Sequence, residues 1–319
     1  MTARHTLTGN IRRHEGFHSE TLGNERETLV YLPPGYRRAG ARRYPVLYLQ
    51  DGQNVFDAVT AFGGVEWMVD ETAQQLIKQR LVEPLIIVAI ANAGDERIHE
   101  YTPTNGRVNP AGKSCARSRG RLRMYGRFLV EELKPSIDQS YRTQAEKEFT
   151  GIGGSSLGGL ASLLLAFWYP ETFTRAAALS PSIWWDDCVI YRIVEEMEYV
   201  PRASRIWLDT GTNEEGWERA GHLRDLLAER GWRLHGELQY AEIPGGEHNE
   251  ASWAQRLEAV LRYLYPPLPP GLERARPPTI AFRRLDPPVP VLRRLEKFSR
   301  HPLTHGPTLL VKEPYEHRK

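Results

Sequence analysis

A glycine-rich turn near the middle of the chain constrains the fold more than any other feature. Residues 154–158 read Gly-Ser-Ser-Leu-Gly, which is a G-x-S-x-G pattern. The preceding residues, 148–152, are typical of a short strand, and the apolar run 160–169 is typical of a helix that stops at Pro170. A strand, a sharp turn and a helix in this order form a nucleophile elbow, which lifts one serine hydroxyl above a sheet. Ser156 is therefore the candidate nucleophile, although the bare motif also arises by chance in about one chain in ten of this length.

Strand-like and helix-like segments alternate along the first 265 residues. The strand candidates lie at 44–50, 84–90, 175–179, 204–209 and 234–243, and those at 84–90, 175–179 and 204–209 are typical of strands buried on both faces. The helix candidates have apolar residues at helical spacing and lie at 65–80, 121–138, 217–230 and 252–263, with Pro135 expected to kink or end the second of them. Two opening strands, at 6–17 and 27–32, have turn residues around them. This order predicts an α/β fold with a mostly parallel central sheet, helices on both faces and antiparallel N-terminal strands.

Composition is that of an ordinary globular protein, 40% hydrophobic and 26% charged. No stretch is long and apolar enough to span a membrane, and the first 20 residues lack the apolar core of a signal peptide. The two cysteines, Cys115 and Cys188, are too few for a disulfide framework and lack metal-site spacing, which favours free thiols in a reducing compartment. We therefore expect a cytoplasmic protein with no membrane association, no metal and no cofactor.

The last 54 residues differ from the rest. Residues 266–319 hold 12 of the 23 prolines and 11 basic against 5 acidic residues, and they show no regular periodicity. We therefore predict two parts, a domain at 1–265 and a Pro/Arg-rich C-terminal extension at 266–319. The basic surplus is small and no recognition motif accompanies it, so nucleic-acid binding is not expected. The sequence leaves a homo-oligomer open.

A serine nucleophile needs a partner base, because its hydroxyl is a poor nucleophile at neutral pH. In folds with this elbow, an acid and then a histidine follow the serine along the chain. His248 lies in a glycine-rich loop between the last strand and the last helix, at the sheet edge where catalytic groups collect. The acid is left open by spacing alone, since Asp209, Glu214 and Glu215 all follow the preceding strand or end it.

Backbone and side-chain groups around the serine complete the candidate site. An oxyanion hole needs two N–H groups, expected from Leu157 and from Gln53 in the loop after the 44–50 strand. Gly52 is expected to let that loop approach the substrate.

Two further loops supply candidates for substrate contact. Trp184 and Trp185 follow the strand after the elbow helix and are candidates for an aromatic platform, although core packing explains at least one of them equally well. Arg97, Glu100 and Tyr101 lie on the loop after a central strand and are candidates for binding a polar substrate.

Together these segments resemble the putative-esterase family of α/β-hydrolases, which includes feruloyl esterases, S-formylglutathione hydrolases, enterochelin-type esterases and mycolyltransferases. The resemblance spans about residues 5–265 and implies the α/β-hydrolase fold. The matching segments are 48–57, 97–103, 128–135, 141–143, 153–159, 180–185, 211–214 and 245–248. The Asp51-Gly52-Gln53 loop is more similar to the enterochelin-esterase-like and mycolyltransferase branches than to the formylglutathione hydrolases.

The resemblance also implies an acid and an activity. Family members carry the acid at the fourth place of a Gly-Thr-Asn-Asp or Gly-Thr-x-Glu segment, which here is Glu214, where many relatives have aspartate. It implies a serine esterase that cleaves small-molecule carboxylic esters through Ser156, His248, Glu214 and an acyl-enzyme. The alternatives are an acyltransferase of the mycolyltransferase type and a non-catalytic binding protein on the same fold. The complete order of the three residues argues against the last.

Overall fold

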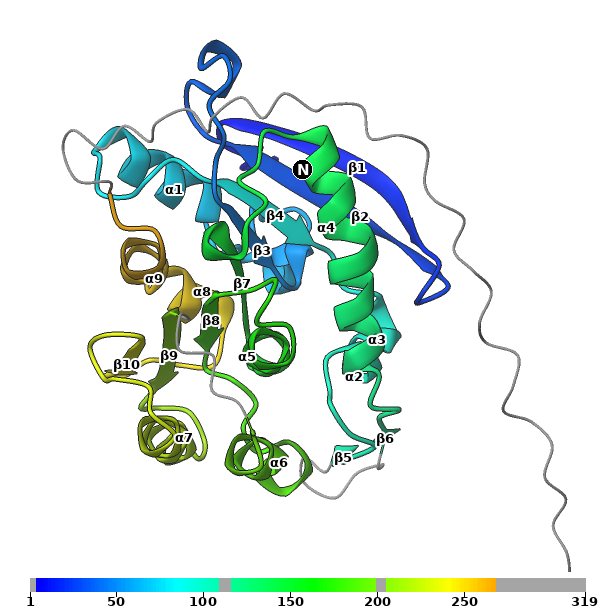
Figure 1. The fold of residues 1–319 in the computed structure, drawn as a ribbon, viewed down its shortest axis with the longest axis vertical. Coiled ribbons are helices and arrows are strands. Elements are labelled where there is room, and N and C mark those ends of the chain that lie inside the picture. Colours follow the sequence, from blue (N-terminus) through cyan, green and yellow to red (C-terminus); the bar gives the residue numbers. More distant parts are fainter. Residues whose placement is uncertain (1–3, 109–115, 199–204, 268–319) are drawn as a thin grey trace, which may run out of the picture. The chain divides into compact units, whose positions relative to one another are not determined.

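The computed structural model describes residues 4–108, 116–198 and 205–267, and these contain one central sheet with helices against both faces (Figure 1). Cys115 and almost all of the predicted C-terminal extension at 266–319 lie outside the described residues, so the division of the chain at 265 stays a prediction. Among the described helices, none has both the length and the apolar character needed to cross a membrane.

Eight strands form the sheet in the spatial order β1-β2-β4-β3-β7-β8-β9-β10. Their bounds are β1 (Asn10–Ser19), β2 (Asn24–Leu32), β3 (Val46–Leu49), β4 (Ile86–Ile90), β7 (Thr150–Ser155), β8 (Arg175–Leu179), β9 (Arg205–Gly211) and β10 (Leu238–Ile243). Six neighbouring strands run parallel to one another, namely β4, β3, β7, β8, β9 and β10. Strand β2 is antiparallel to both β1 and β4. The predicted α/β class, with a mostly parallel sheet and antiparallel N-terminal strands, is confirmed. A separate pair is formed by β5 (Arg107–Val108) and β6 (Ala116–Arg117).

Alternation along the strands produces two apolar layers, one on each face of the sheet. On β3, Val46 and Tyr48 belong to one buried cluster, and Leu47 and Leu49 belong to the other. The first cluster contains side chains of α3 (Leu122–Arg127), α4 (Lys134–Ser140), α5 (Ser156–Trp168), α6 (Trp185–Glu195) and α7 (Glu218–Glu229). The second contains side chains of α1 (Val69–Lys78), α8 (Glu250–Ala254) and α9 (Leu257–Leu264). The helices therefore divide between the two faces, as the sequence pattern predicts.

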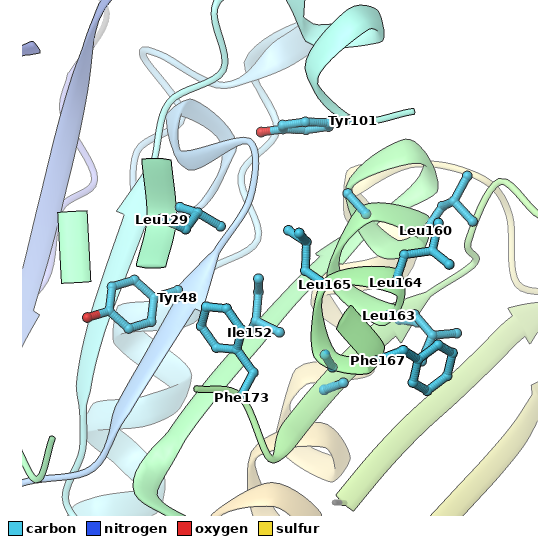
Figure 2. Close-up of a cluster of buried hydrophobic side chains, with 14 of the residues drawn as sticks. Tyr48, Tyr101, Leu129, Ile152, Leu160, Leu163, Leu164, Leu165, Phe167 and Phe173 are labelled. Carbon is cyan, nitrogen blue, oxygen red and sulfur yellow. The ribbon is translucent and has the colours of Figure 1, made fainter. Parts of the chain in front are cut away.

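Helix α5 is apolar around its whole circumference, which is the pattern of a helix enclosed by other elements. Residues 157–167 are all buried. Figure 2 shows Leu160, Leu163, Leu164, Leu165 and Phe167 projecting from this helix into the apolar layer. This packing fixes the start of α5 at the end of β7, and thereby fixes the elbow serine.

The predicted helix at 121–138 differs from expectation at Pro135. The helix continues to Ser140 instead of ending, because a π-helical stretch, η5 (Phe128–Leu133), precedes the proline. The Lys134 N–H there bonds the carbonyl of Leu129, five residues back. A proline lacks an N–H and crowds the carbonyl four residues earlier, so a locally wider helix accommodates it without a break.

Two other helices also differ from the prediction. The expected helix at 252–263 is two helices, α8 and α9, separated at residues 255–256. Helix α6 has no counterpart among the predicted elements. Its first turn is irregular, since Asp186, Asp187 and Cys188 all have φ between 46° and 59°.

Candidate active site

Loops from the carboxyl ends of neighbouring parallel strands meet at one edge of the sheet. Ser156 follows β7, Glu214 follows β9 and His248 follows β10. The loops after β3 and β8 lie at the same edge, because the strands run in one direction. This edge is where open α/β sheets bind their ligands.

Ser156 occupies a strained turn between β7 and α5. Its φ is 55°, in the left-handed region that residues with a Cβ rarely adopt. The turn is tight enough that a Cβ on Gly154 would lie 2.7 Å from the carbonyl carbon of Gly158. Glycine is therefore required at 154, and the chain holds Ser156 in a conformation that costs on the order of 1–3 kcal/mol and marks functional sites.

Ser156, His248 and Glu214 form a continuous hydrogen-bonded series. Ser156 Oγ lies 2.9 Å from His248 Nε2, and Glu214 Oε2 lies 2.9 Å from His248 Nδ1. An ionised carboxylate only accepts hydrogen bonds, so Nδ1 carries the proton and Nε2 is left to accept the Ser156 hydroxyl. The rings of His248 and Trp253 also pack nearly perpendicular to each other, with ring centroids 5.0 Å apart.

Hydrogen bonds keep Glu214 ionised. Its Oε1 atom accepts from the Gly211 N–H at 2.8 Å, from Ser180 Oγ at 2.5 Å and from Arg256 Nη2 at 3.3 Å. Burial acts to raise the pKa of this carboxyl, but the hydrogen bonds from His248, Ser180 and Gly211 outweigh it and hold the pKa below its ordinary value. Oε1 is thus occupied, and Oε2 is directed at His248.

The other two acid candidates do not contact His248. Asp209 is fully buried at the end of β9, where it accepts from Trp207 Nε1 and Arg256 Nη1, both at 2.7 Å. Burial raises the pKa of Asp209, against the opposing effect of Arg256. Glu215 is exposed.

An ion pair and a hydrogen bond of the Asp51 carboxylate hold the loop after β3 in place. Asp51 has a φ of 54°, and its carboxylate is gripped by Arg97 through Nε–Oδ1 at 2.6 Å and Nη2–Oδ2 at 2.8 Å. Asn92 donates to the same carboxylate at 2.6 Å. These bonds fix the short helix η2 (Gly52–Asn54), which carries Gln53.

The expected role of Gly52 needs correction. A Cβ at this position would lie 2.5 Å from the Ala89 carbonyl carbon and the Ile90 nitrogen. The missing side chain therefore lets η2 lie against the end of β4, and the close approach is to protein backbone rather than to substrate.

The two predicted oxyanion donors lie on elements that flank the serine. Leu157 is in the first turn of α5, where N–H groups lack acceptors within the helix. Gln53 is the middle residue of η2, and its side-chain Oε1 accepts from the Asn92 N–H at 3.2 Å.

Three of the five proposed substrate contacts are buried away from solvent. Trp185 is a core residue whose Nε1 donates to Thr104 Oγ1, and Glu100 forms a fully buried ion pair with Arg26 at 2.9 Å. Tyr101 is also fully buried, and its hydroxyl accepts from the Asp51 N–H at 3.3 Å. These three residues support the fold beneath the site rather than present a surface to a substrate.

The remaining two are accessible. Trp184 is 41% exposed, and the Arg97 side chain is 27% exposed beside its partner Asp51. Trp184 follows the loop in which the hydroxyl of Ser182 lies 3.2 Å from Ser156 Oγ. It therefore stays a candidate for substrate contact, whereas the guanidinium of Arg97 is already engaged with Asp51.

Sequence reasoning missed several polar residues around the series, namely Ser180, Ser182, Glu250 and Arg256. Ser180 sits in the segment used for the family resemblance, but only its φ of 42° and its bond to Glu214 reveal its place. Arg256 was hidden inside a predicted helix. The sequence offers one indication: Arg256 is a charged residue three positions after Trp253 and four before Val260, on the apolar side of the predicted helix.

Comparison with known proteins places the chain in a family. The family model described as "Putative esterase" matches residues 19–264. Uncharacterized protein YbbA of Bacillus subtilis is 28% identical over 69% of this chain and 78% of its own length. An endo-1,4-beta-xylanase/feruloyl esterase of Xylanibacter ruminicola is 26% identical over 81% of this chain, which spans only 31% of that larger protein.

A solved structure has the same fold. The enterobactin esterase FES of Shigella flexneri, crystallised in the presence of enterobactin, superposes with a TM-score of 0.65 at 21% identity, over 81% of this chain and 60% of its own. This confirms the α/β-hydrolase fold. Since the family model covers most of the chain, the protein belongs to the putative esterase family of carboxylic ester hydrolases.

Proposed function

We propose that the protein hydrolyses small-molecule carboxylic esters by a Ser156–His248–Glu214 triad and an acyl-enzyme. The observation that carries the proposal is the pair of 2.9 Å contacts that join the three side chains in the order that serine esterases need. The strained φ of Ser156 supports it, because such strain persists at sites where a side chain must be presented.

The proposed reaction begins when Ser156 Oγ attacks the ester carbonyl carbon. His248 Nε2 takes the hydroxyl proton, and Glu214 stabilises the resulting imidazolium through Nδ1. Collapse of the tetrahedral intermediate expels the alcohol, which receives the proton from Nε2. Water then attacks the acyl-enzyme with His248 as base, releasing the acid and restoring Ser156.

The proposed oxyanion hole consists of the Gln53 and Leu157 main-chain N–H groups. Both belong to short, rigidly held turns, one anchored by Asp51 and Arg97 and the other by the buried helix α5. Pre-oriented N–H groups of this kind stabilise the developing oxyanion without reorganisation.

We also propose a class of ester substrate. The named relatives include a feruloyl esterase and an enterobactin esterase. The exposed ring of Trp184 beside the Ser182 loop favours an ester with an aromatic group, which the indole can stack upon. We therefore propose small aromatic-acyl esters as the first substrates to test.

Acyl transfer to an added alcohol or sugar is the second candidate. The His248 side chain is 42% exposed, so an acceptor other than water has access to the base that would activate it. A product ratio that shifts from acid to transferred ester when acceptor is added would identify transfer. A non-catalytic binding protein is disfavoured by the hydrogen-bonded series itself.

Labelling with a fluorophosphonate probe tests the proposal. Intact mass should show one phosphonyl group on the wild-type protein and none on Ser156→Ala, which should keep the fold and lose nearly all ester hydrolysis. Equal hydrolysis of a feruloyl or other aryl ester by the two proteins would exclude Ser156 as the nucleophile.

A further inference from the structure

Arg256 and Asp209 form a fully buried ion pair next to Glu214, and this pair contacts the carboxylate oxygen that does not bind His248. Arg256, in the break between α8 and α9, bridges two carboxylates through Nη1–Asp209 Oδ1 at 2.7 Å and Nη2–Glu214 Oε1 at 3.3 Å. Its side chain is 2% exposed, and that of Asp209 is not exposed at all. Ser180 links the three groups, since its Oγ accepts from Arg256 Nη1 at 2.7 Å and donates to Glu214, while its N–H donates to Asp209 Oδ1 at 3.1 Å.

The surroundings of Asp209 are built for an ionised carboxylate. Its three partners, Trp207 Nε1, the Ser180 N–H and Arg256 Nη1, are all donors. A protonated acid would need an acceptor for its hydrogen, and none of these groups offers one. Asp209, Glu214 and Arg256 therefore carry two negative charges and one positive charge between them.

The charge balance of this group matters for the base. If Arg256 faced Glu214 alone, the pair would be neutral and would stabilise an imidazolium at His248 only weakly. Because Asp209 already balances Arg256, the charge of Glu214 remains uncompensated until His248 takes a proton. Arg256 meanwhile holds Oε1, which leaves Oε2 aimed at Nδ1.

We propose that Asp209 and Arg256 are positioning residues that act through Glu214, Arg256 by orienting its carboxylate and Asp209 by cancelling the charge of Arg256. The inference rests on the proposed esterase function. Glu250, two residues after His248, interacts electrostatically with His248 and with the Asp51–Arg97 pair. The variants below leave these three residues unchanged.

The test measures the rate of fluorophosphonate labelling against pH, which reports the fraction of enzyme with a free base at His248. Asp209→Asn should move the acid limb of this profile to lower pH by about one unit, because uncompensated Arg256 disfavours the imidazolium. Arg256→Gln should move it to higher pH, because Glu214 then faces His248 without a neighbouring cation. Below the limb, where the rate follows the fraction of free base, Asp209→Asn should therefore label faster than wild type and Arg256→Gln more slowly.

The double variant Asp209→Asn/Arg256→Gln removes both charges and should return the limb to within a few tenths of a unit of wild type. Arg26→Gln is the matched control, since it breaks another fully buried ion pair, with Glu100, and should leave the limb in place. Circular dichroism identifies any variant that fails to fold. If Asp209→Asn is lost in this way, the shifts of Arg256→Gln and of the double variant still decide the matter.

Unchanged limbs in the folded variants, or shifts of the two single variants in the same direction, would overturn this inference while leaving the esterase proposal intact. Absence of labelling in the folded wild-type protein would instead overturn the proposed function itself.

Discussion

At the scale of single residues, the two oxygens of Glu214 have different tasks. Oε2 faces His248, whereas Oε1 is held by Gly211, Ser180 and Arg256. Glu214→Gln keeps the shape but offers an amide that can donate to Nδ1 and so favour the wrong tautomer. We expect turnover to fall by roughly 10²–10⁴-fold, as loss of the acid does in other triads. Steady-state kinetics with an aryl ester, compared with Glu215→Gln as the exposed neighbour, measures the effect.

The pH dependence of this substitution has a definite sign. The pKa of Glu214 is lowered in the folded protein, so its contribution to stability is present above the ordinary glutamate pKa and is lost as pH falls through the lowered value. Glu214→Gln should therefore destabilise the protein at pH 7 more than at pH 3. An equal loss of thermal stability at both pH values would contradict the ionised state of Glu214.

Local signals in the sequence are enough to nominate some site residues, whereas residues defined by distant contacts leave no such signal. Ser156 and His248 lie in glycine-rich turns whose chemistry is visible in a few letters. Arg256 and Ser180 are 76 residues apart along the chain. Their roles are recognisable only once the fold brings β8, β9 and the α8–α9 break together. The sequence leaves both a substrate platform and core packing open for Trp184 and Trp185, and only tertiary packing shows that Trp185 is the buried one.

At the scale of secondary structure elements, the placement of η2 against β4 depends on one missing side chain. Gly52→Ala would bring a Cβ to 2.5 Å from the β4 backbone, where nothing flexible can yield. We expect η2 to be displaced, with a stability loss of about 1–3 kcal/mol and a fall in turnover of roughly 10²-fold from the misplaced Gln53 N–H. Chemical denaturation and kinetics on the same preparation separate the two effects.

Gly221→Ala is the matched control for that experiment. Gly221 lies inside α7, and a Cβ there would meet its nearest neighbour, the Tyr240 hydroxyl, at an ordinary 3.5 Å. Alanine in a helix interior should stabilise the protein by about 0.5–1 kcal/mol and leave turnover unchanged. A Gly52→Ala enzyme as active as Gly221→Ala would exclude η2 from the oxyanion site.

Apart from α6, the order of the strands of the main sheet and of their covering helices was predictable, because apolar runs and helical repeats have different periods. The boundaries of the elements and the breaks within helices were less predictable, and two helices show the physical reasons. The π-helical stretch at 128–133 absorbs Pro135, which a local rule treats as a helix breaker. The predicted helix at 252–263 is divided at residues 255–256, and the side chain of Arg256 in this break reaches two carboxylates.

At the scale of the whole described domain, a buried acidic group opposes folding at high pH. Glu66, Asp70 and Glu71 have carboxylate oxygens within 4.8 Å of one another, and Asp70 is fully buried. Burial, followed by the adjacent Glu71, raises the pKa of Asp70 to about 8, although the Thr8 N–H bonds it at 2.6 Å. In the sequence Asp70 is only a favourable first-turn acid of a helix, since Thr8 lies 62 residues away.

The sign of this effect is opposite to that of Glu214. A group with a raised folded pKa stabilises the protein below its unfolded value, near 3.8, and that stability is lost as pH rises through about 8. Wild-type protein should therefore unfold at a lower temperature at pH 8.5 than at pH 5.5. Asp70→Asn keeps an acceptor for Thr8 and gives Glu71 a neutral donor, so this difference should shrink.

Differential scanning fluorimetry at the two pH values measures the change. Relief of each kcal/mol of repulsion corresponds to about 2–4 °C in a domain of this size, so at pH 8.5 the variant should melt at least that much above wild type. Glu258→Gln, which removes an exposed acid paired with Arg262, serves as the control and should leave the pH dependence as it is. Parallel melting curves for wild type and Asp70→Asn across this range would mean that Asp70 is ionised in the folded protein throughout, and that the cost of its burial is met by other groups.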